Sequence, residues 1–328
     1  MLRAMRLPLA ALLALLVLVT LPAALPAEAG QPARARSAIF FYPWYSNPRF
    51  DGHYAHWTQG GRTPPSDLAS SYFPARGAYS SSDPKVVRSQ MKEIASAGVD
   101  QVVSSWWGMG SAEDKRLPLV IRTARRFGLE TAIHLEPYPE RTVDTVAADL
   151  VYFARLGIRD VYVYRTSDFS AAEWARVTRA PRRLRLFGQT NRVGFAAAAG
   201  FDGFYTYDIL LYHGAKFERL CAQARAKGIL CAPSVGPGYD AWHATGDTRA
   251  KPRLDGATYD SMWRAAVQAG ADVVTITSYN EWGEGTQIEP AGRGGRYVSY
   301  DGAYGLRGRA AQRAYLMRTR QWTDRFSR

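Results

Sequence analysis

The sequence predicts an α/β protein built on a single (β/α)8 barrel, also called a TIM barrel, and two observations lead to this fold class. Eight short runs rich in β-branched and aromatic residues recur along the chain, and amphipathic stretches with helical spacing separate most of them. A repeated strand–helix order implies parallel strands, because successive strands are then joined by helical crossovers. Eight such units in roughly 300 residues are typical of a closed barrel.

The expected elements follow one another at regular intervals. Strands are expected near residues 38–44, 100–106, 130–136, 159–165, 183–188, 201–207, 229–234 and 272–280. Helices are expected between most of them, at 84–97, 115–127, 142–156, 215–227 and 258–269, with a closing helix near 308–326. Asp83 and Pro84 have the residue types that begin a helix, and glycines such as Gly98 and Gly128 stand where helices end.

The first 29 residues have the pattern of a signal peptide. Arg3 and Arg6 precede an apolar stretch at 7–25, and residues 27–29 (Ala-Glu-Ala) fit the small-x-small rule for cleavage. Prolines interrupt the apolar stretch, so it is short for a membrane-spanning helix, and an uncleaved anchor is the alternative. We therefore expect a catalytic domain at 30–328 that is secreted or extracytoplasmic, with no other membrane contact.

The chain is strongly basic, with a formal net charge of +13 carried mainly by arginine. Arginine is densest at 179–185 and 307–328, but no nucleic-acid motif accompanies it, so we expect no nucleic-acid partner. We expect a monomer. The two cysteines, Cys221 and Cys231, exclude a disulfide scaffold, and they are either bridged to each other or buried as free thiols.

Polar and aromatic side chains gather where the expected strands end, which is where barrel enzymes hold their active sites. Glu281 and Glu284 are the most informative, because they follow a β-branched run and flank Trp282. Breaking a glycosidic bond requires one group to protonate the leaving oxygen and another to assist at the sugar, and paired carboxylates supply both. The alternative is two exposed glutamates on a turn.

Strand periodicity predicts which of these side chains share a face. His134 and Glu136 should lie on one face of their strand, and Thr275, Thr277, Tyr279 and Glu281 on one face of theirs, pointing into the barrel.

His53 and His56 have a spacing that metal ligands use, but they stand in a Gly- and Pro-rich loop without an evident third partner. We therefore expect neither a catalytic metal nor a cofactor.

Several long motifs, in one order along the chain, make the sequence similar to a known family. They include FYPWYSNPRFDGHYAHW (41–57), VVSSWWG (102–108), IHLEPY (133–138), GFDGFYTYD (200–208) and TSYNEWGEGTQIEPA (277–291). On these motifs the chain resembles glycoside hydrolase family 99, the endo-α-1,2-mannosidases. The resemblance implies a retaining enzyme acting on internal linkages of mannan or N-glycan-like chains, with a mannose-containing glycan as its partner.

The resemblance also implies roles for particular residues. The sugar's own 2-hydroxyl would attack the anomeric carbon to give a 1,2-anhydro sugar. Glu281 would act as base and then acid, whereas Glu284 would protonate the leaving oxygen and later activate water. Glu136 would contact the sugar, with a buried ion pair to an arginine as the alternative. The remaining substrate-binding candidates are Tyr42, Tyr205, Tyr207, Tyr239, Asn280, Trp282 and one of Trp106 and Trp107 as a platform under a sugar ring.

Two departures from the family pattern affect specificity more than chemistry. Many relatives have histidine where this chain has Gly283, which predicts a smaller pocket wall. The stretch 168–192 is only weakly family-like, so subsites built there do not transfer. A glycosidase acting on another surface glycan and a non-catalytic carbohydrate-binding barrel are the competing functions.

Overall fold

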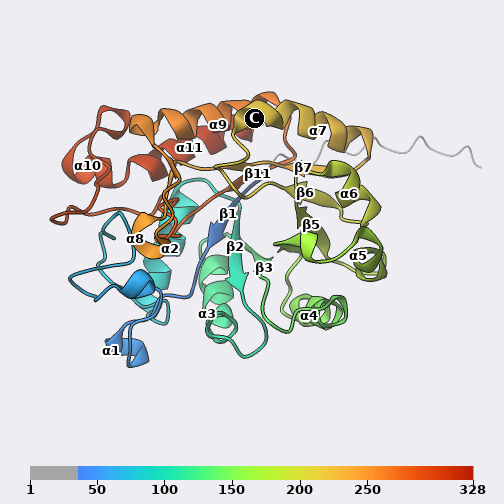
Figure 1. Cartoon of the computed structure of the whole chain (residues 1–328), viewed down its shortest axis with the longest axis horizontal. Helices are drawn as coiled ribbons and strands as arrows, with labels where there is room; N and C mark the ends of the chain where they lie inside the picture. The colour runs from blue at the N-terminus through green and yellow to red at the C-terminus, as the bar shows by residue number, and fades with distance from the viewer. Residues whose placement is uncertain (1–35, 328) are drawn as a thin grey trace, which may run out of the picture. The chain divides into compact units, whose positions relative to one another are not determined.

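Parallel strands form the centre of the computed structural model, which describes residues 36–327, and they curl into a nearly closed barrel (Figure 1). Each of the first six pairs in parallel with the next along the chain. The six are β1 (Arg36–Phe41), β2 (Gln101–Trp106), β3 (Glu130–Leu135), β4 (Asp160–Val163), β5 (Arg185–Gln189) and β6 (Gly203–Tyr205). On its other side β1 pairs with the last strand, β11 (Val273–Ile276).

The seventh strand position closes the barrel in two pieces, β7 (Leu230–Ala232) and β8 (Ser234–Val235). β7 pairs with β6, whereas β8 pairs with β11, both in parallel. Pro233 separates the two pieces, and proline has no N–H to donate to a sheet ladder. All eight predicted strand positions are therefore occupied by strands, and the predicted barrel is confirmed.

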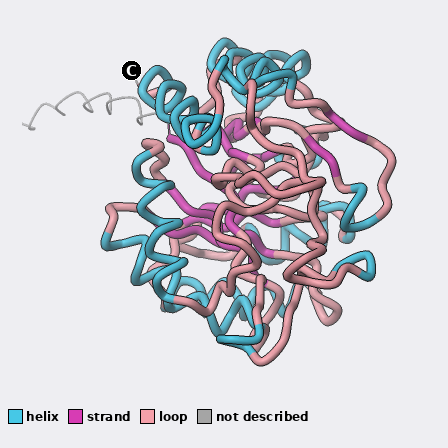
Figure 2. Tube along the Cα trace, turned by 90° about the vertical axis from the view of Figure 1, so that its left-hand side faces the viewer, coloured by secondary structure: helices cyan, strands magenta, loops and turns pink. Residues whose placement is uncertain are grey.

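Helices surround the strands, as Figure 2 shows by colour. The main helices are α2 (Pro84–Ser96), α3 (Ala112–Arg126), α4 (Val143–Arg155), α5 (Ala171–Thr178), α6 (Val193–Ala198), α7 (Phe217–Ala226), α9 (Ala257–Gln268), α10 (Gly308–Gln312) and α11 (Ala314–Phe326). Short elements decorate the loops: α1 (Pro48–Asp51), α8 (Trp242–Thr245), β9 (Tyr239–Asp240), β10 (Ala250–Lys251), and 3-10 turns at Gln59–Gly61, Thr166–Asp168, Gly214–Lys216, Leu254–Gly256 and Ala303–Gly305. The sequence did not predict α5 and α6, and it predicted α10 and α11 as one helix.

The alternation of side chains along the strands divides the core into two layers. Phe40 and Tyr42 belong to an inner cluster that fills the barrel, whereas Ile39 and Phe41 belong to the layer between strands and helices. The inner cluster is unusually aromatic for a barrel interior. Its members are Ala38, Phe40, Tyr42, Val103, Ala132, Tyr162, Phe187, Tyr205, Tyr207, Ala232 and Val273.

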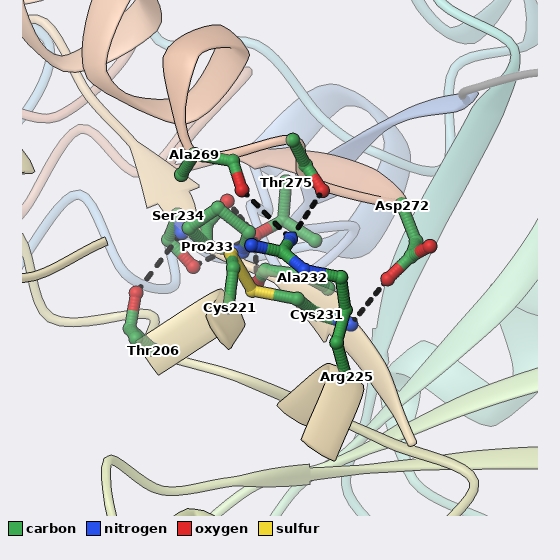
Figure 3. The surroundings of a disulfide bond; sticks show 11 residues. Thr206, Cys221, Arg225, Cys231, Ala232, Pro233, Ser234, Ala269, Asp272 and Thr275 are labelled. Carbon is green, nitrogen blue, oxygen red and sulfur yellow. Dashed lines mark hydrogen bonds between the residues drawn. A yellow bond between two sulfur atoms is a disulfide. The ribbon is translucent and has the colours of Figure 1, made fainter. Parts of the chain in front are cut away.

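A disulfide joins Cys221 on α7 to Cys231 on β7, so of the two alternatives left by the sequence the structure has the bridge (Figure 3). Both cysteines are fully buried. The amide of Cys231 donates to Asp272 Oδ2 at 2.8 Å, which ties this bridge to the start of β11.

The expected signal peptide, residues 1–29, lies outside the described residues. Between residues 36 and 327 the structure contains no helix with the length and apolar character needed to cross a membrane.

Candidate active site

Glu281 and Glu284 stand on a tight turn that follows β11 at the C-terminal end of the barrel. The amide of Glu281 donates to Ser278 Oγ at 2.8 Å, and the amide of Glu284 donates to Glu281 Oε1 at 3.3 Å. Glu281 is 5% exposed, and Glu284 is half-buried. The pair is therefore not an exposed turn of glutamates but two carboxyl groups facing a partly enclosed space.

This environment raises the pKa of both carboxyl groups. Burial, followed by the charge of Glu284, raises the pKa of Glu281 well above its usual range. Burial, followed by the charges of Asp208 and Glu136, raises the pKa of Glu284 to about 7. Two interacting acids with raised pKa values can hold one proton between them near neutrality, which is the state that acid–base catalysis needs.

Two tyrosines from opposite sides of the barrel meet beside Glu284. The hydroxyls of Tyr42 and Tyr207 are 2.5 Å apart, and Tyr207 OH donates to Glu284 Oε2 at 3.4 Å. Tyr207 has a φ of 56°, and its amide donates to Ser234 Oγ at 2.7 Å. A tyrosine in the left-handed region is strained, so the surrounding structure must hold it there. The structure thus brings Tyr42, Tyr207 and the glutamate pair together.

Glu136 belongs to a second polar group at the ends of β2 and β3. Ser105 Oγ donates to Glu136 Oε1 at 2.9 Å, and His134 Nδ1 is 2.8 Å from the same oxygen without being aligned for a hydrogen bond. His134 Nε2 and Tyr205 OH are 2.9 Å apart. None of the ion pairs in residues 36–327 joins Glu136 to an arginine, so that alternative is not what the structure contains. Ser105 was missed in the sequence, although it alternates with Val103 on the inner face.

Trp106 is the last residue of β2, and Trp107, which follows it, differs from it in exposure. Trp106 is fully buried against Phe153, and its Nε1 donates to Asp114 at 2.9 Å in the helix layer. Trp107 is half-buried, and its Nε1 is buried without a hydrogen-bond partner among the described residues. Of the two, Trp107 is therefore the more exposed.

Asn280 and Trp282 are fully buried and hold neighbouring segments of the site in place. The side chain of Asn280 pairs with both backbone groups of Tyr42, accepting at 2.8 Å and donating at 2.9 Å. Trp282 is fully buried and donates from Nε1 to Glu289 Oε2 at 2.9 Å. Glu289, which the sequence analysis did not single out, also pairs with Arg76 at 2.9 Å.

One placement predicted from periodicity is wrong. Tyr279 was expected to point into the barrel, but its hydroxyl donates to Glu93 Oε2 on α2 at 2.7 Å. β11 ends at Ile276, so the two-residue alternation of a strand does not extend to Tyr279. Thr277 does face the barrel, where its hydroxyl donates to the carbonyl of Tyr207 at 3.2 Å.

A small cavity of about 180 Å³ lies beside Glu284, and we call it the inner cavity. Tyr239 lines it, and its hydroxyl donates to Asp247 at 3.0 Å. Asp247 in turn pairs with Arg249 at 2.7 Å. The other lining residues include Tyr164, Tyr207, Asp208, Leu210 and Thr277. Asp208 and Tyr164 were not singled out as site residues from the sequence.

The space beside the Cα of Gly283 is filled by neighbouring atoms rather than open. A Cβ placed on Gly283 would lie 3.0 Å from Glu281 Oε1 and 3.2 Å from Gln59 Oε1. It would also lie 3.4 Å from the Cβ of Ala244. Residues from two other loops therefore fill the space beside this glycine.

His53 and His56 line one hollow, but their rings make different contacts. His56 stacks on Trp44 with ring centroids 4.3 Å apart, and burial lowers its pKa to about 4. His53 is exposed, with Nδ1 2.8 Å from the carbonyl oxygen of Asp51. Across residues 36–327, no three His, Cys, Asp or Glu side chains form a group that could hold a metal ion.

Known proteins with similar sequences and structures are consistent with this barrel. Glycosyl hydrolase family 99 matches residues 34–170 and 184–328. The glycoprotein endo-alpha-1,2-mannosidase of Mus musculus is 30% identical over an alignment that covers 88% of this chain and 74% of that protein. The glycoprotein endo-alpha-1,2-mannosidase-like protein of Homo sapiens is 31% identical over an alignment that covers 77% of this chain and 68% of that protein.

A solved structure gives the same result. The GH99 endo-alpha-mannosidase from Bacteroides thetaiotaomicron matches with a TM-score of 0.78 at 28% identity, covering 89% of this chain and 97% of that one. The match spans the barrel and both catalytic candidates of this chain fall within the family match. The chain is therefore a glycoside hydrolase, and it belongs to glycosyl hydrolase family 99.

Proposed function

We propose that this protein is an extracytoplasmic, retaining endo-α-1,2-mannosidase that cuts internal α-mannosidic linkages of mannan or N-glycan-like chains. The observation that carries the proposal is that the carboxyl groups of buried Glu281 and half-buried Glu284 stand on one turn beside the Tyr42–Tyr207 contact, with the amide of Glu284 donating to Glu281. An acid and a base at the strand ends of a barrel are what hydrolysis of a glycosidic bond requires.

In the proposed first step Glu281 takes the proton of the sugar's 2-hydroxyl as that oxygen attacks the anomeric carbon. The bond to the leaving sugar breaks, and Glu284 donates its proton to the departing oxygen. In the second step Glu284 takes a proton from water as the water oxygen attacks the anomeric carbon. The bond between the anomeric carbon and the 2-oxygen breaks, and Glu281 returns its proton to the 2-oxygen. Both carboxyls end in their starting states.

The contacts of the two residues support this division of roles. The amide of Glu284 donates to Glu281, and a donated hydrogen bond favours the ionised form of a carboxyl group. Among residues 36–327 the carboxyl of Glu284 accepts a hydrogen bond only from the Tyr207 hydroxyl, at 3.4 Å. Its pKa is raised to about 7, so it retains a proton close to neutral pH. Burial raises the pKa of Glu281 as well, so the proposal assigns the shared proton to Glu284 on the hydrogen bond that Glu281 accepts, not on the pKa values.

The hydroxyl-rich surroundings suit a mannose ring. Tyr42, Tyr207 and Glu136 offer donors and acceptors around the pair, and Trp107 offers an aromatic face. An extracytoplasmic location is supported by the signal-like pattern of residues 1–29 and by the Cys221–Cys231 disulfide, because disulfides persist in oxidising compartments.

The test is to incubate the purified protein with α-1,2-branched mannan and with defined manno-oligosaccharides, and to identify the products by mass. The proposal predicts oligosaccharide products from internal cleavage. Release of single mannose residues only, or no cleavage of any mannoside, would contradict it.

A further inference from the structure

The end of the barrel opposite the active site carries exposed arginines, and we call this surface the basic face. In a parallel barrel the connections from each helix to the next strand lie at the N-terminal ends of the strands, whereas Glu281 and Glu284 follow the C-terminal end of β11. The last turns of α3 and α4, and the segments that lead into β4 and β5, supply the face. Its arginines are Arg125, Arg126, Arg155, Arg159 and Arg183, all exposed.

Two hollows make these connections one continuous surface. The first has a volume of about 420 Å³, lies between the ends of α3 and α4, and is lined by Arg125, Leu156 and Arg159 among others. The second has a volume of about 800 Å³, lies between α4 and the segment that leads into β5, and is lined by Arg155 and Arg183 among others. Arg155 and Leu156 are neighbours in the chain, so the two hollows adjoin at the end of α4.

The positive charge of the basic face is not neutralised by nearby carboxylates. Of the described residues that line the two hollows, Glu130 is the one carboxylate, and it pairs with Arg36 at 2.7 Å. Asp202, close to the second hollow, pairs with Arg182 at 2.5 Å. Among residues 36–327 no ion pair includes any of the five arginines of the basic face. Their charges are therefore free to attract an anionic partner.

The second hollow places apolar surface between these arginines. Leu150, Val151, Val177 and Pro181 line it, and Val151 is 54% exposed. A guanidinium group matches the geometry of a phosphate group, with which it can form two parallel hydrogen bonds. Arginines around an apolar hollow therefore fit the boundary of a bilayer, where phosphate groups lie above hydrocarbon.

We propose that the basic face docks on a membrane surface that contains anionic phospholipids, with Arg155 and Arg183 against the phosphate groups. In this orientation the strand ends that carry Glu281 and Glu284 point away from the bilayer and stay open to glycans. β1 begins at Arg36 at this same end, so the chain enters the barrel from the face that meets the membrane. The inference does not depend on the proposed glycosidase mechanism.

The experiment measures how the full chain partitions onto lipid vesicles by sedimentation. One set of vesicles is phosphatidylcholine alone, and the other is phosphatidylcholine with an equal amount of phosphatidylglycerol, which is anionic. The basic-face variant combines Arg155→Gln with Arg183→Gln, because glutamine removes the charge at exposed positions.

The matched control combines Arg49→Gln with Arg192→Gln. These arginines are also exposed, and no ion pair among residues 36–327 includes them. They follow β1 and β5 and therefore lie at the active-site end. Residues 1–35 are the same in every variant, so any lipid affinity of that segment cancels in the comparison.

The unaltered protein and the control should prefer the anionic vesicles, and the preference should weaken as salt is added, because salt screens the attraction. The basic-face variant should bind anionic vesicles about 25-fold more weakly, since each arginine near an anionic surface contributes about fivefold. Its binding to phosphatidylcholine alone should not change.

Two results would overturn the proposal. One is no preference of the unaltered protein for anionic vesicles, or the same preference in the basic-face and control variants. The other is binding of a short DNA duplex more tightly than of anionic vesicles, with that binding lost in the basic-face variant, which would assign the face to nucleic acid.

Discussion

The carboxylate of Glu281 accepts the backbone N–H of Glu284 at 3.3 Å, so the two residues that perform the proposed chemistry are hydrogen-bonded to each other through the turn they share. The spacing of three residues makes this contact local. The base is thereby oriented by the segment that carries the acid, and a shift of either residue displaces the other.

The first prediction concerns replacement of each carboxyl group by an amide. Glu281→Gln and Glu284→Gln should each lower kcat by about 100-fold or more, because an amide keeps the size but cannot exchange the proton. Glycan affinity should stay within about tenfold, since most binding contacts remain. Kinetics and calorimetry check this, and turnover like that of the unaltered protein would remove that residue from the mechanism.

The second prediction concerns pH and stability. The carboxyl of Glu284 has an ordinary pKa of 4.5, and in the folded protein its pKa is raised to about 7. Between pH 4.5 and 7 this carboxyl is ionised in the unfolded chain but stays protonated in the folded protein. The free energy of unfolding therefore falls as pH rises from about 4.5, and the loss is complete above about pH 7.

Glu284→Gln cannot ionise and avoids this penalty. Its Tm should therefore exceed that of the unaltered protein by more at pH 8 than at pH 4.5, as thermal melts at the two pH values will show. A difference that is constant, or larger at pH 4.5, would contradict the raised pKa. Because Glu284 is only half-buried, the effect is expected to be modest.

The third prediction concerns Gly283. In Gly283→Ala the new Cβ would lie 3.0 Å from Glu281 Oε1 and would push the carboxylate aside, so kcat should fall about tenfold. Gly292→Ala is the matched control, because there the nearest atom to the new Cβ is at an ordinary 3.4 Å. Equal activity of the two variants would mean that the position of Glu281 tolerates displacement.

The fourth prediction concerns Arg253, whose guanidinium is enclosed by aromatic rings. Its Nη2 donates to the carbonyls of Gly285 at 2.9 Å and Gln287 at 2.7 Å, just after Glu284. Its Cζ is 4.6–4.8 Å from the ring centroids of Tyr72, Tyr300 and Tyr315. The Arg253 guanidinium therefore holds the loop that follows Glu284 in place through these hydrogen bonds.

Arg253→Met should lower the free energy of unfolding by about 3 kcal/mol, since two charge-assisted hydrogen bonds are lost. Arg253→Lys should recover little, because an ammonium group cannot reproduce the planar fork. Denaturant unfolding measures both. Arg318→Lys, where the arginine is paired with Asp260 away from the acid's loop, is the control for loss of a guanidinium over aromatic rings. If Arg253→Met were as stable as the unaltered protein, this arginine would not secure the loop.

Most of the barrel could be predicted from the sequence because strand and helix signals are local. The β-branched runs and the glycines after helices are read within a few residues, and all eight strand positions were found this way. The short helices α5 and α6 were missed, although α5 begins with a capping box of Ser170 and Glu173. A helix of 8 residues shows too little periodicity to stand out.

The site residues that belong to a recognisable motif could be predicted from the sequence. The contacts between segments distant in the sequence could not. Motifs identified Glu281, Glu284 and Tyr207. The support of Trp282 by Glu289 and the packing of Gln59 beside Gly283 depend on tertiary contacts that no local pattern encodes. The inward placement expected for Tyr279 failed because the strand ends before it.

The measurement that tests the central claim most directly is proton NMR of the product as it first forms. If Glu281 assists attack by the sugar's own 2-hydroxyl and Glu284 protonates the leaving oxygen, two successive inversions return the original stereochemistry. The mannose whose anomeric carbon reacts becomes the new reducing end of its product, and it should appear first as the α-anomer. A substrate in which this mannose lacks the 2-hydroxyl should not be cleaved. Initial appearance of the β-anomer, or ready cleavage of the 2-deoxy substrate, would contradict the account.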